Sequence, residues 1–427
     1  MEIIRYPQQE IWPELCTRPS AGVSGLETQV RNIMEEVRKD GDAALRRLTE
    51  QYDHVVIDSI EVTEQEIENA SACTTGAFRD AVHLAAGNIM RFHRSQLRKE
   101  RWITTSPGVR CMLKEVPVGK VGLYVPGGSA PLISTVLMLA VPASVAGCRE
   151  IILCTPPGKD GRIHSGILYA ARHAGVHRIF RVGGAQAIAA MAYGTVSIPR
   201  VYKIFGPGNR YVTMAKQLAV TMDVAVDLPA GPSELLIIAD ETADAEFTAA
   251  DLLSQAEHGG DSQVILLTTS ERLLDTVRRL ISEQTAGLPR KEIIMASLGQ
   301  SRLILMNNIE EMIGFSNIYA PEHLVLNIRN PESYMEKIMN AGSVFIGPWS
   351  AQSAGDYATG TNHTLPTNRS ALAWSGLTTG SFMKNITVQK LTFRGIREIG
   401  RAVEKLAVEE KLEAHANAIR IRLNRKK

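Results

Sequence analysis

The sequence predicts an α/β protein with two modules, each built around a parallel sheet. From Val109 onward, short apolar segments with the composition of strands alternate with helical segments. This alternation is typical of βαβ units. It restarts after the segment DLPAGPSE, so we expect two Rossmann-like modules. The chain has 427 residues, which is long for a single domain and agrees with this division.

The same alternation indicates where the domains begin and end. Residues 1–20 are punctuated by proline and form a small N-terminal segment that we expect to pack on another part of the chain. Residues 124–233 form the first α/β module. Residues 234–375 form the second, which we group with residues 21–123 as one discontinuous domain. Residues 376–427 complete the chain as a small helical C-terminal unit.

The first hundred residues are expected to be mainly helical. Apolar residues recur at helical spacing over Gly25–Arg47 and again over Thr63–Lys99. Thr63 is followed three residues later by Glu66, which predicts a capping box at a helix start. Many charged residues lie between the apolar ones. We therefore expect long amphipathic helices here rather than a catalytic module.

The strand-like segments VRCMLKEVPV and VGLYV are expected to lead into the first module, where PGGSAPLIS and a buried helix through Ala146 follow. Strands and helices then alternate through REIILCTPP, a helix to His173, HRIFRVGG, the helix AQAIAAMAYG, VYKIFGPG and the helix NRYVTMAKQL. Each apolar segment is short enough for a strand, and each intervening segment is long enough for a crossover helix.

The second module repeats this order with LLIIAD, a helix into LLSQAEH, QVILLTT, a helix to Glu283, RLILM, HLVLNI, a further helix and SVFIG. From Ser375 onward no further strand is expected. The segment FMKNITVQKL and one helix over Phe393–Arg420 are expected to form the C-terminal unit.

Composition argues against several classes of protein. Lys and Arg number 47 against 45 Asp and Glu, and the basic excess is confined to the C-terminus RIRLNRKK, so no nucleic-acid partner is predicted. The five cysteines include no CxxC pair and are expected to be reduced thiols. No signal peptide is evident, and the longest apolar run, Leu132–Ala146, is too short to span a bilayer. We expect a soluble, cytoplasmic protein without a membrane partner.

The segment Leu252–Gly260, LLSQAEHGG, places two possible ligands at the end of a helix. Gln255 and His258 are three residues apart, so both side chains leave the same face just before the next strand. Ligands of open parallel sheets collect beyond the strand ends, which makes this amide and imidazole candidates for half of a site. Taken alone, the segment is better explained as a solvated helix end with a capping histidine.

Three strand-to-helix junctions of the first module are rich in glycine, namely PGGSAP (126–131), GGAQ (183–186) and GPGN (206–209). Glycine lets backbone N–H groups approach a ligand, and a helix N-terminus favours an anion. None of the three matches GxGxxG followed by an acidic residue, and each alone could simply close a tight turn. Three on the same sheet edge favour a nucleotide-sized ligand lying across it.

The second module carries the candidate reactive groups. Glu322 and His323 stand side by side just ahead of a strand, and Asp356 lies in a loop rich in Gly, Ser and Thr. In the last helix, His415 follows Glu410 by five residues. Each residue taken separately is more readily explained by a structural role. Together with the amide and imidazole described above, they form a set of N and O donors without sulfur. Such a set suits zinc or another borderline divalent ion at a catalytic site.

One resemblance covers nearly the whole chain. It rests on the order and spacing of VGLYVPGGSAPLISTVLMLAVPASVAGC, VGGAQAIAA, KIFGPGN, DLPAGPSE, ADLLSQAEHG, YAPEHL and AGDYATGTNHTLPT. In these segments the sequence resembles the histidinol dehydrogenase family. The resemblance implies a zinc-dependent enzyme that oxidises L-histidinol to L-histidine via L-histidinal, by two successive hydride transfers to NAD, as the last step of histidine biosynthesis. The stretch NRSALAWSGLTTGSFMKN is less typical of the family.

The resemblance also implies the roles of single residues. The acid–base pair would be Glu322 and His323. One zinc per subunit would be held by Gln255, His258, Asp356 and His415. NAD would contact Tyr124, Gln186 and Asn209, and the substrate would contact Ser233, Gln255, His258, His323, Asp356, Glu410 and His415.

The resemblance further implies the division of work between the domains. Residues 21–123 and 234–375 would hold zinc and substrate, and residues 124–233 would bind NAD. Residues 376–427 would form the dimerisation unit of an intertwined homodimer, in which this unit completes the active site of the partner subunit.

Two other functions are weighed against this one. A paralogue could oxidise a different small alcohol with the same Glu322–His323 pair, but Glu410 favours histidinol because a carboxylate can hold the cationic end of that substrate. A non-catalytic scaffold is disfavoured by the intact acid–base pair and the complete set of ligands. The implied chemistry agrees with the residues, since His323 suits a base near neutral pH and Glu322 could deprotonate the water that hydrates the aldehyde.

Overall fold

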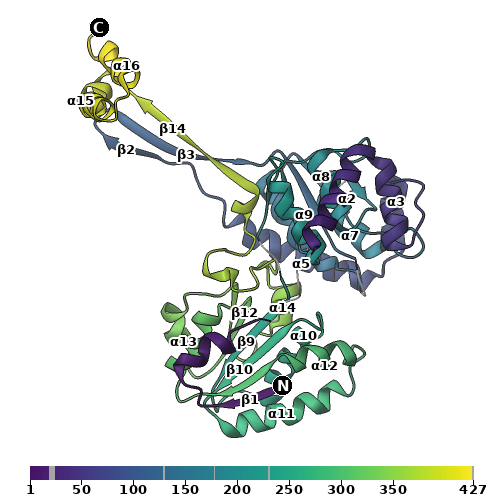
Figure 1. Cartoon of the computed structure of the whole chain (residues 1–427). Coiled ribbons are helices and arrows are strands. Elements are labelled where there is room, and N and C mark those ends of the chain that lie inside the picture. The colour runs from purple at the N-terminus through teal and green to yellow at the C-terminus, as the bar shows by residue number, and fades with distance from the viewer. Residues whose placement is uncertain (19–24, 128–129, 177, 229–230, 426–427) are drawn as a thin grey trace.

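The protein consists of two α/β domains with a long arm that extends away from them (Figure 1). The computed structural model describes residues 1–18, 25–127, 130–176, 178–228 and 231–425. Predictions that fall on residues 19–24, 128–129, 177, 229–230 and 426–427 lie outside these ranges. The described residues form one six-stranded sheet, one five-stranded sheet and one three-stranded sheet. The first two sheets are parallel, which confirms the predicted α/β fold class with two Rossmann-like modules.

The six-stranded sheet belongs to the domain that contains the N-terminus. Its strand order is β1 (Glu2–Arg5), β11 (Arg302–Leu305), β10 (Gln263–Thr268), β9 (Glu234–Ala239), β12 (His323–Asn327) and β13 (Ser343–Ile346). Side chains alternate between the two faces of a strand. Leu235 and Ile237 therefore pack on one side with α10 (Ala245–Ala256), α11 (Glu271–Thr285) and α12 (Lys291–Gly299). Leu236 and Ile238 pack on the other side with α1 (Trp12–Leu15) and α13 (Ile309–Tyr319).

The five-stranded sheet has the order β6 (Arg178–Phe180), β5 (Glu150–Cys154), β4 (Lys120–Tyr124), β7 (Lys203–Phe205) and β8 (Ala225–Val226). One face is covered by α2 (Leu26–Asp40), α3 (Asp42–Asp53), α8 (Gly184–Tyr193) and α9 (Arg210–Val220). The other face is covered by α4 (Glu64–Ala72), α5 (Gly76–Arg94), α6 (Ile133–Ala146) and α7 (Ser165–His173). Helices on both faces explain why these strands are apolar at nearly every position.

The N-terminal helices lie on a different sheet from the one with which the sequence analysis grouped them. Residues 21–123 were assigned with 234–375, but the helices α2 to α5 pack on the five-stranded sheet. The capping box of Thr63 and Glu66 is present at the start of α4. Only β1, from residues 1–20, joins the six-stranded sheet, by pairing with β11. Helical spacing predicts that a helix has an apolar face, but it does not tell which sheet that face covers.

The arm differs from the prediction in two ways. The segment expected to contain no strand forms β14 (Met383–Leu391), which pairs antiparallel with β3 (Val109–Pro117), while β3 also pairs with β2 (Trp102–Ser106). Most residues of β14 are exposed, so its sequence lacks the alternation that marks a half-buried strand. The single helix expected over 393–420 is divided into α15 (Phe393–Glu409) and α16 (Glu413–Leu423) by a turn at Lys411, whose φ is +61°.

The remaining elements are short helices in the segments that connect the strands and the longer helices. They are the 3-10 helices η1 (Gln9–Ile11), η2 (Pro331–Lys337), η3 (Ser370–Leu372) and η4 (Thr379–Phe382), and the α-helix α14 (Gln352–Tyr357). Among the described residues, none of the helices combines the length and the apolar character that a bilayer crossing requires.

Candidate active site

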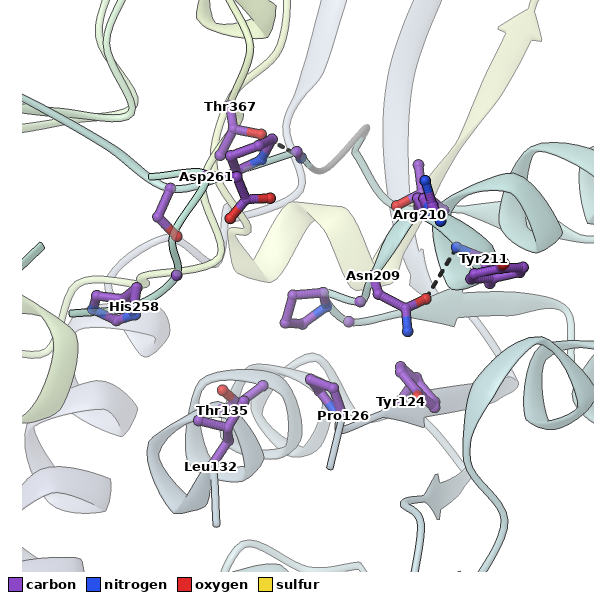
Figure 2. Close-up of a pocket in the computed structure, with 18 of the residues that line it drawn as sticks. Tyr124, Pro126, Leu132, Thr135, Asn209, Arg210, Tyr211, His258, Asp261 and Thr367 are labelled. Atoms are coloured by element: carbon purple, nitrogen blue, oxygen red, sulfur yellow. Dashed lines mark hydrogen bonds between the residues drawn. The ribbon is translucent and has the colours of Figure 1, made fainter. Parts of the chain in front are cut away.

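A cavity of about 2290 Å³ opens between the two α/β domains. Figure 2 shows His258, Asp261 and Thr367 on one side of it and Tyr124, Asn209 and Tyr211 on the other. The domain with the five-stranded sheet contributes the carboxyl ends of its strands, because β4 ends at Tyr124. The domain with the six-stranded sheet contributes the amino ends of its strands, because β12 begins at His323. The cavity exceeds the ~300–1,000 Å³ of an ordinary small-molecule pocket, so it has room for a dinucleotide and a second ligand.

Glu322 and His323 are held at the edge of the second sheet by the backbone of Glu234. The N–H of Glu234 donates to Oε2 of Glu322 at 2.9 Å, and the carbonyl oxygen of Glu234 lies 3.2 Å from Nδ1 of His323. Nδ1 of His323 is also 3.5 Å from Oε2 of Glu322. Both side chains are buried. The start of β9 therefore positions the carboxylate and the imidazole together.

The His323 ring lies between two acidic groups. Its Nε2 is 3.5 Å from Oδ1 of Asp356, on the side opposite Glu322. Burial alone lowers the pKa of His323, but the negative charges of Glu322 and Asp356 outweigh burial and raise this pKa to about 10. Asp356, in turn, has its pKa lowered because the His323 contact outweighs its burial.

Gln255, His258 and Asp356 line the same end of the cavity. Gln255 is in the last turn of α10, His258 follows in the turn that leads to β10, and Asp356 is in the short helix α14. The loop expected around Asp356 thus contains one helical turn and a half. Oδ2 of Asp356 accepts a hydrogen bond from the side-chain amide of Gln352, whose own Oε1 accepts one from Ser254 of α10 at 3.0 Å.

The Gln255 side chain indicates that a ligand is needed here. It is fully buried, and neither its Oε1 nor its Nε2 has a hydrogen-bond partner in the described part of the chain. An unpaired buried amide is costly, and metal coordination of Oε1 would relieve half of that cost. Within the described ranges, no three His, Cys, Asp or Glu residues gather closely enough to hold a metal. One chain therefore offers a partial set of N and O donors that fits zinc but needs further ligands.

The other end of the cavity lies at the first sheet. Tyr124 is buried at the end of β4, and its hydroxyl accepts a hydrogen bond from the N–H of Gly184 at 3.0 Å. Gln186 is buried in the first turn of α8. Asn209 is the N-cap of α9, where its Oδ1 accepts from the N–H groups of Tyr211 and Val212 at 3.0 and 3.1 Å. These three residues line the cavity beside the glycine-rich junctions.

Gly206 shows why one of these junctions requires glycine. Its φ is +125°, and a Cβ at this position would lie 2.0 Å from the carbonyl oxygen of Tyr124. A buried ion pair fixes the peptide groups on both sides. Lys216 donates to the carbonyl oxygen of Gly206 at 2.9 Å, Asp227 accepts from its N–H at 2.7 Å, and the two side chains contact each other.

Comparison with known proteins identifies the family. A family model described as histidinol dehydrogenase matches residues 16–423. A histidinol dehydrogenase of Bacteroides thetaiotaomicron is 52% identical over 424 residues, covering 99% of both chains, and one of Xylella fastidiosa is 49% identical over 415 residues, covering 96% of both. The crystal structure of histidinol dehydrogenase from Elizabethkingia anophelis matches with a TM-score of 0.98 and 49% identity, covering 99% of this chain and 98% of that one. The chain belongs to the histidinol dehydrogenase family.

This membership confirms the class of reaction. The chain is an NAD-dependent oxidoreductase, and the reaction of a histidinol dehydrogenase is the final step of histidine biosynthesis. The cavity suits this class because its two ends offer different environments, glycine-rich strand ends on one side and an acid, a base and an unpaired amide on the other.

Two of the residues predicted for the histidinol dehydrogenase site do not line the cavity of their own chain. Glu410 ends α15 and His415 is in α16, and both are exposed. Figure 1 shows these two helices at the far end of the arm, away from the two domains. The structure therefore brings together Gln255, His258, Asp356, Glu322, His323 and Ser233, but not Glu410 or His415.

Two residues of the site, Arg18 and His363, were missed by the sequence analysis. Arg18 pairs with Glu234 through two contacts of 2.9 Å, and its guanidinium lies 3.6 Å from the centre of the Tyr319 ring. His363 lines the cavity, with Nδ1 2.9 Å from the carbonyl oxygen of Asp356. Burial lowers the pKa of His363 despite the neighbouring Asp356. His363 was present in the quoted GTNHTLPT segment, whereas nothing in the N-terminal segment signals the role of Arg18.

Proposed function

We propose that this chain oxidises L-histidinol to L-histidine with two molecules of NAD at the end of the cavity where Glu322 and His323 meet Gln255, His258 and Asp356. The observation that carries this proposal is the fully buried Gln255 amide, for which the described residues provide no hydrogen-bond partner. It lies next to an acid–base pair and across the cavity from the glycine-rich junctions. Zinc would be held by Gln255, His258 and Asp356 of one subunit, with His415 of a partner subunit as the fourth ligand.

Zinc, when bound, would supply a positive charge that fixes the imidazole and the amine of the substrate. The protein residues then carry the proton transfers. Nδ1 of His323 faces the carbonyl oxygen of Glu234, so Nδ1 keeps a proton in both states of the ring. The carboxylates of Glu322 and Asp356 raise the His323 pKa and favour the protonated ring. Zinc held by Asp356 would offset one of these negative charges, and the ring, once neutral, has its lone pair on Nε2. Nε2 is buried and lies on the Asp356 side of the ring. We therefore assign Nε2 as the base that takes the alcohol proton while the C–H bond delivers hydride to NAD.

The second oxidation requires water. As water adds to the aldehyde carbonyl, Glu322 is placed to take a proton from that water, because its carboxylate lies beside the imidazole. His323 returns to the carbonyl oxygen the proton that it took from the alcohol, which gives the hydrate and a neutral imidazole. The hydrate then loses a second hydride to a second NAD, and its hydroxyl proton passes to His323, which leaves the carboxylic acid. Ser233 precedes Glu234 and lines the cavity, so we propose that its hydroxyl contacts the substrate.

NAD would lie across the carboxyl edge of the five-stranded sheet. Its pyrophosphate would meet the N-termini of α8 and α9, where backbone N–H groups and the helix dipole favour an anion. Tyr124, Gln186 and Asn209 line this part of the cavity and are the proposed contacts. The nicotinamide ring would point toward His323, since hydride leaves the carbon whose hydroxyl faces that base.

The arm supports a shared site in a homodimer. The hairpin of α15 and α16 exposes Leu406 (64%), Leu412 (42%) and Ile421 (61%), which is an apolar surface beside the predicted ligands. Because Glu410 and His415 lie on this hairpin, we propose that it inserts at the cavity of a second copy and there holds the substrate amine and the metal.

The proposal is tested by stoichiometry. The purified protein should contain about one zinc per chain, and each molecule of L-histidinol should yield two molecules of NADH. One NADH per histidinol would show that the reaction stops at the aldehyde and would remove the role given to Glu322. Failure to form NADH from histidinol, with zinc present, would overturn the proposed substrate.

A further inference from the structure

The cavity continues past Tyr124 into a region that the chemistry above does not use. There it runs between α2, α3 and α9, and its lining includes Gln29, Ile33, Tyr52, Asp53 and Tyr211. Tyr211 donates from its hydroxyl to Gln29 at 3.3 Å, which links α9 to α2 across this end. Figure 2 shows Tyr211 beyond Asn209 as seen from His258, so this region continues past the GPGN junction. A dinucleotide whose pyrophosphate lies on the glycine-rich junctions would therefore place its adenosine half here.

The surroundings of Asp53 disfavour the charge of its carboxylate. Its Oδ2 is buried and has no hydrogen-bond partner among the described residues. Burial raises the pKa of Asp53, and only the neighbouring His54 opposes that effect. Asp53 is also the last residue of α3, where the helix dipole repels a carboxylate. A carboxylate kept in a place that disfavours its charge is a candidate for binding a ligand.

Among the described residues, none donates a hydrogen bond to the buried Oδ2 of Asp53. The Tyr124 hydroxyl accepts from the N–H of Gly184, and the described residues give it no hydrogen bond to Asp53. Burial and then the nearby charge of Asp53 raise the Tyr124 pKa, so the two groups lie close to each other. Asp227, the other acid at this end, is already occupied by Lys216 and the N–H of Gly206. The carboxylate of Asp53 is thus available to a ligand that brings its own donors.

We propose that Asp53 accepts hydrogen bonds from the adenosine ribose hydroxyls of NAD and thereby excludes NADP. Two vicinal hydroxyls provide two donors for one carboxylate. In NADP the 2′-hydroxyl is replaced by a phosphate with about two negative charges, which removes a donor and adds repulsion. The inference rests on the proposed placement of NAD at Tyr124, Gln186 and Asn209.

The test compares cofactors in the zinc-loaded enzyme with saturating L-histidinol. The kcat/KM for NAD and for NADP is measured in the wild type, in Asp53→Ala and in Asp53→Asn. Glu50→Gln is the matched control, because Glu50 is an exposed acid on the same helix. Loss of hydrogen bonds to a charged group should lower kcat/KM for NAD roughly 10- to 100-fold in Asp53→Ala, mainly through KM. Removal of the repulsion should reduce the NAD:NADP preference by about tenfold or more. The KM for histidinol and the zinc content should stay unchanged.

A third cofactor separates the ribose from the base. Nicotinamide hypoxanthine dinucleotide keeps both ribose hydroxyls but has an oxo group in place of the adenine amino group. Asp53→Ala should lose as much efficiency with this analogue as with NAD. If the wild type already loses that efficiency with the analogue and Asp53→Ala adds nothing, Asp53 binds the base and the ribose assignment is wrong.

Two further results would contradict the role proposed for Asp53. An unchanged NAD:NADP ratio in both Asp53 variants, or a wild type that uses NADP as well as NAD, would overturn the proposal. Asp53→Asn keeps the size of the side chain, so a folded protein is available even if Asp53→Ala is unstable. A wild type that reduces no NAD with histidinol would contradict the proposed function instead, so the two failures are distinguishable.

Discussion

The cavity and the arm present their candidate ligands in opposite ways. In the cavity, Gln255, His323 and Asp356 are buried and are fixed by strands, by helix ends and by neighbouring side chains. On the arm, Glu410 and His415 are exposed on a helical hairpin, beside apolar residues that are also exposed. One set is already positioned within a single chain, and the other requires a second surface. The proposed shared site accounts for this difference, because it would be complete only when two chains meet.

The largest expected effect is at the metal-binding half of the cavity. Replacement His258→Asn should remove zinc and lower kcat by roughly 10³-fold or more, since a bound metal supplies several kcal/mol of charge stabilisation. Metal content and NADH formation are measured together. His83→Asn is the control, because His83 is an exposed histidine on α5 outside the cavity. Full zinc occupancy in His258→Asn would contradict its assignment as a ligand.

A second large effect should separate the two oxidations. Glu322→Gln should keep its zinc, because Glu322 is not a proposed ligand, and should reduce turnover of supplied L-histidinal by ~10²–10⁴-fold. His323→Asn should also keep zinc but should impair oxidation of L-histidinol from the first step. The two substrates are assayed separately for each variant. Glu322→Gln that oxidises histidinal at the wild-type rate would disprove its role in activating water.

A smaller effect is expected where the N-terminal segment supports the cavity. Arg18 and Glu234 form a buried pair with side chains 6% and 1% exposed, and Glu234 positions Glu322 and His323. Arg18→Gln leaves the Glu234 charge unpaired, which should lower the free energy of unfolding by about 3–5 kcal/mol. Denaturant unfolding of the holoenzyme measures this change.

The control for Arg18 is another pair that ties the same segment to the same domain. Arg5 and Glu271 are 46% and 59% exposed, so Arg5→Gln should change stability by only ~0–1 kcal/mol. The double variant Arg18→Gln with Glu234→Gln should recover part of the lost stability, because it leaves no unpaired charge. Equal destabilisation by Arg5→Gln and Arg18→Gln would show that burial of the Arg18–Glu234 pair does not increase the cost of removing its arginine.

The sequence predicted the parallel modules well because their strands are buried on both faces and therefore apolar throughout. It failed for β14, whose side chains are mostly exposed, and for the turn at Lys411, where a non-glycine residue adopts a positive φ. It also misassigned α2 to α5, because an amphipathic pattern does not name its partner. For β14 and for α2 to α5, the missing information was the packing between elements distant in sequence.

The candidate site was predictable to a different extent. Glu322 with His323, and Gln255 with His258, are short sequence patterns, and the structure places both at the cavity. Arg18 could not be found, because its partner Glu234 lies 216 positions along the chain. Asp53 carried no motif at all, and only its unpaired burial in the folded protein marks it.

The most direct test of the shared site is complementation between inactive variants. Subunits with His258→Asn are mixed with subunits with His415→Asn under conditions of subunit exchange, and heterodimers are confirmed by distinct tags. If His415 serves the partner's cavity, each heterodimer has one site with both lesions and one with neither. Activity should then return to on the order of a quarter of the wild type, because half of the dimers are mixed. If heterodimers form and no activity returns, His415 acts in its own chain and the shared site is refuted.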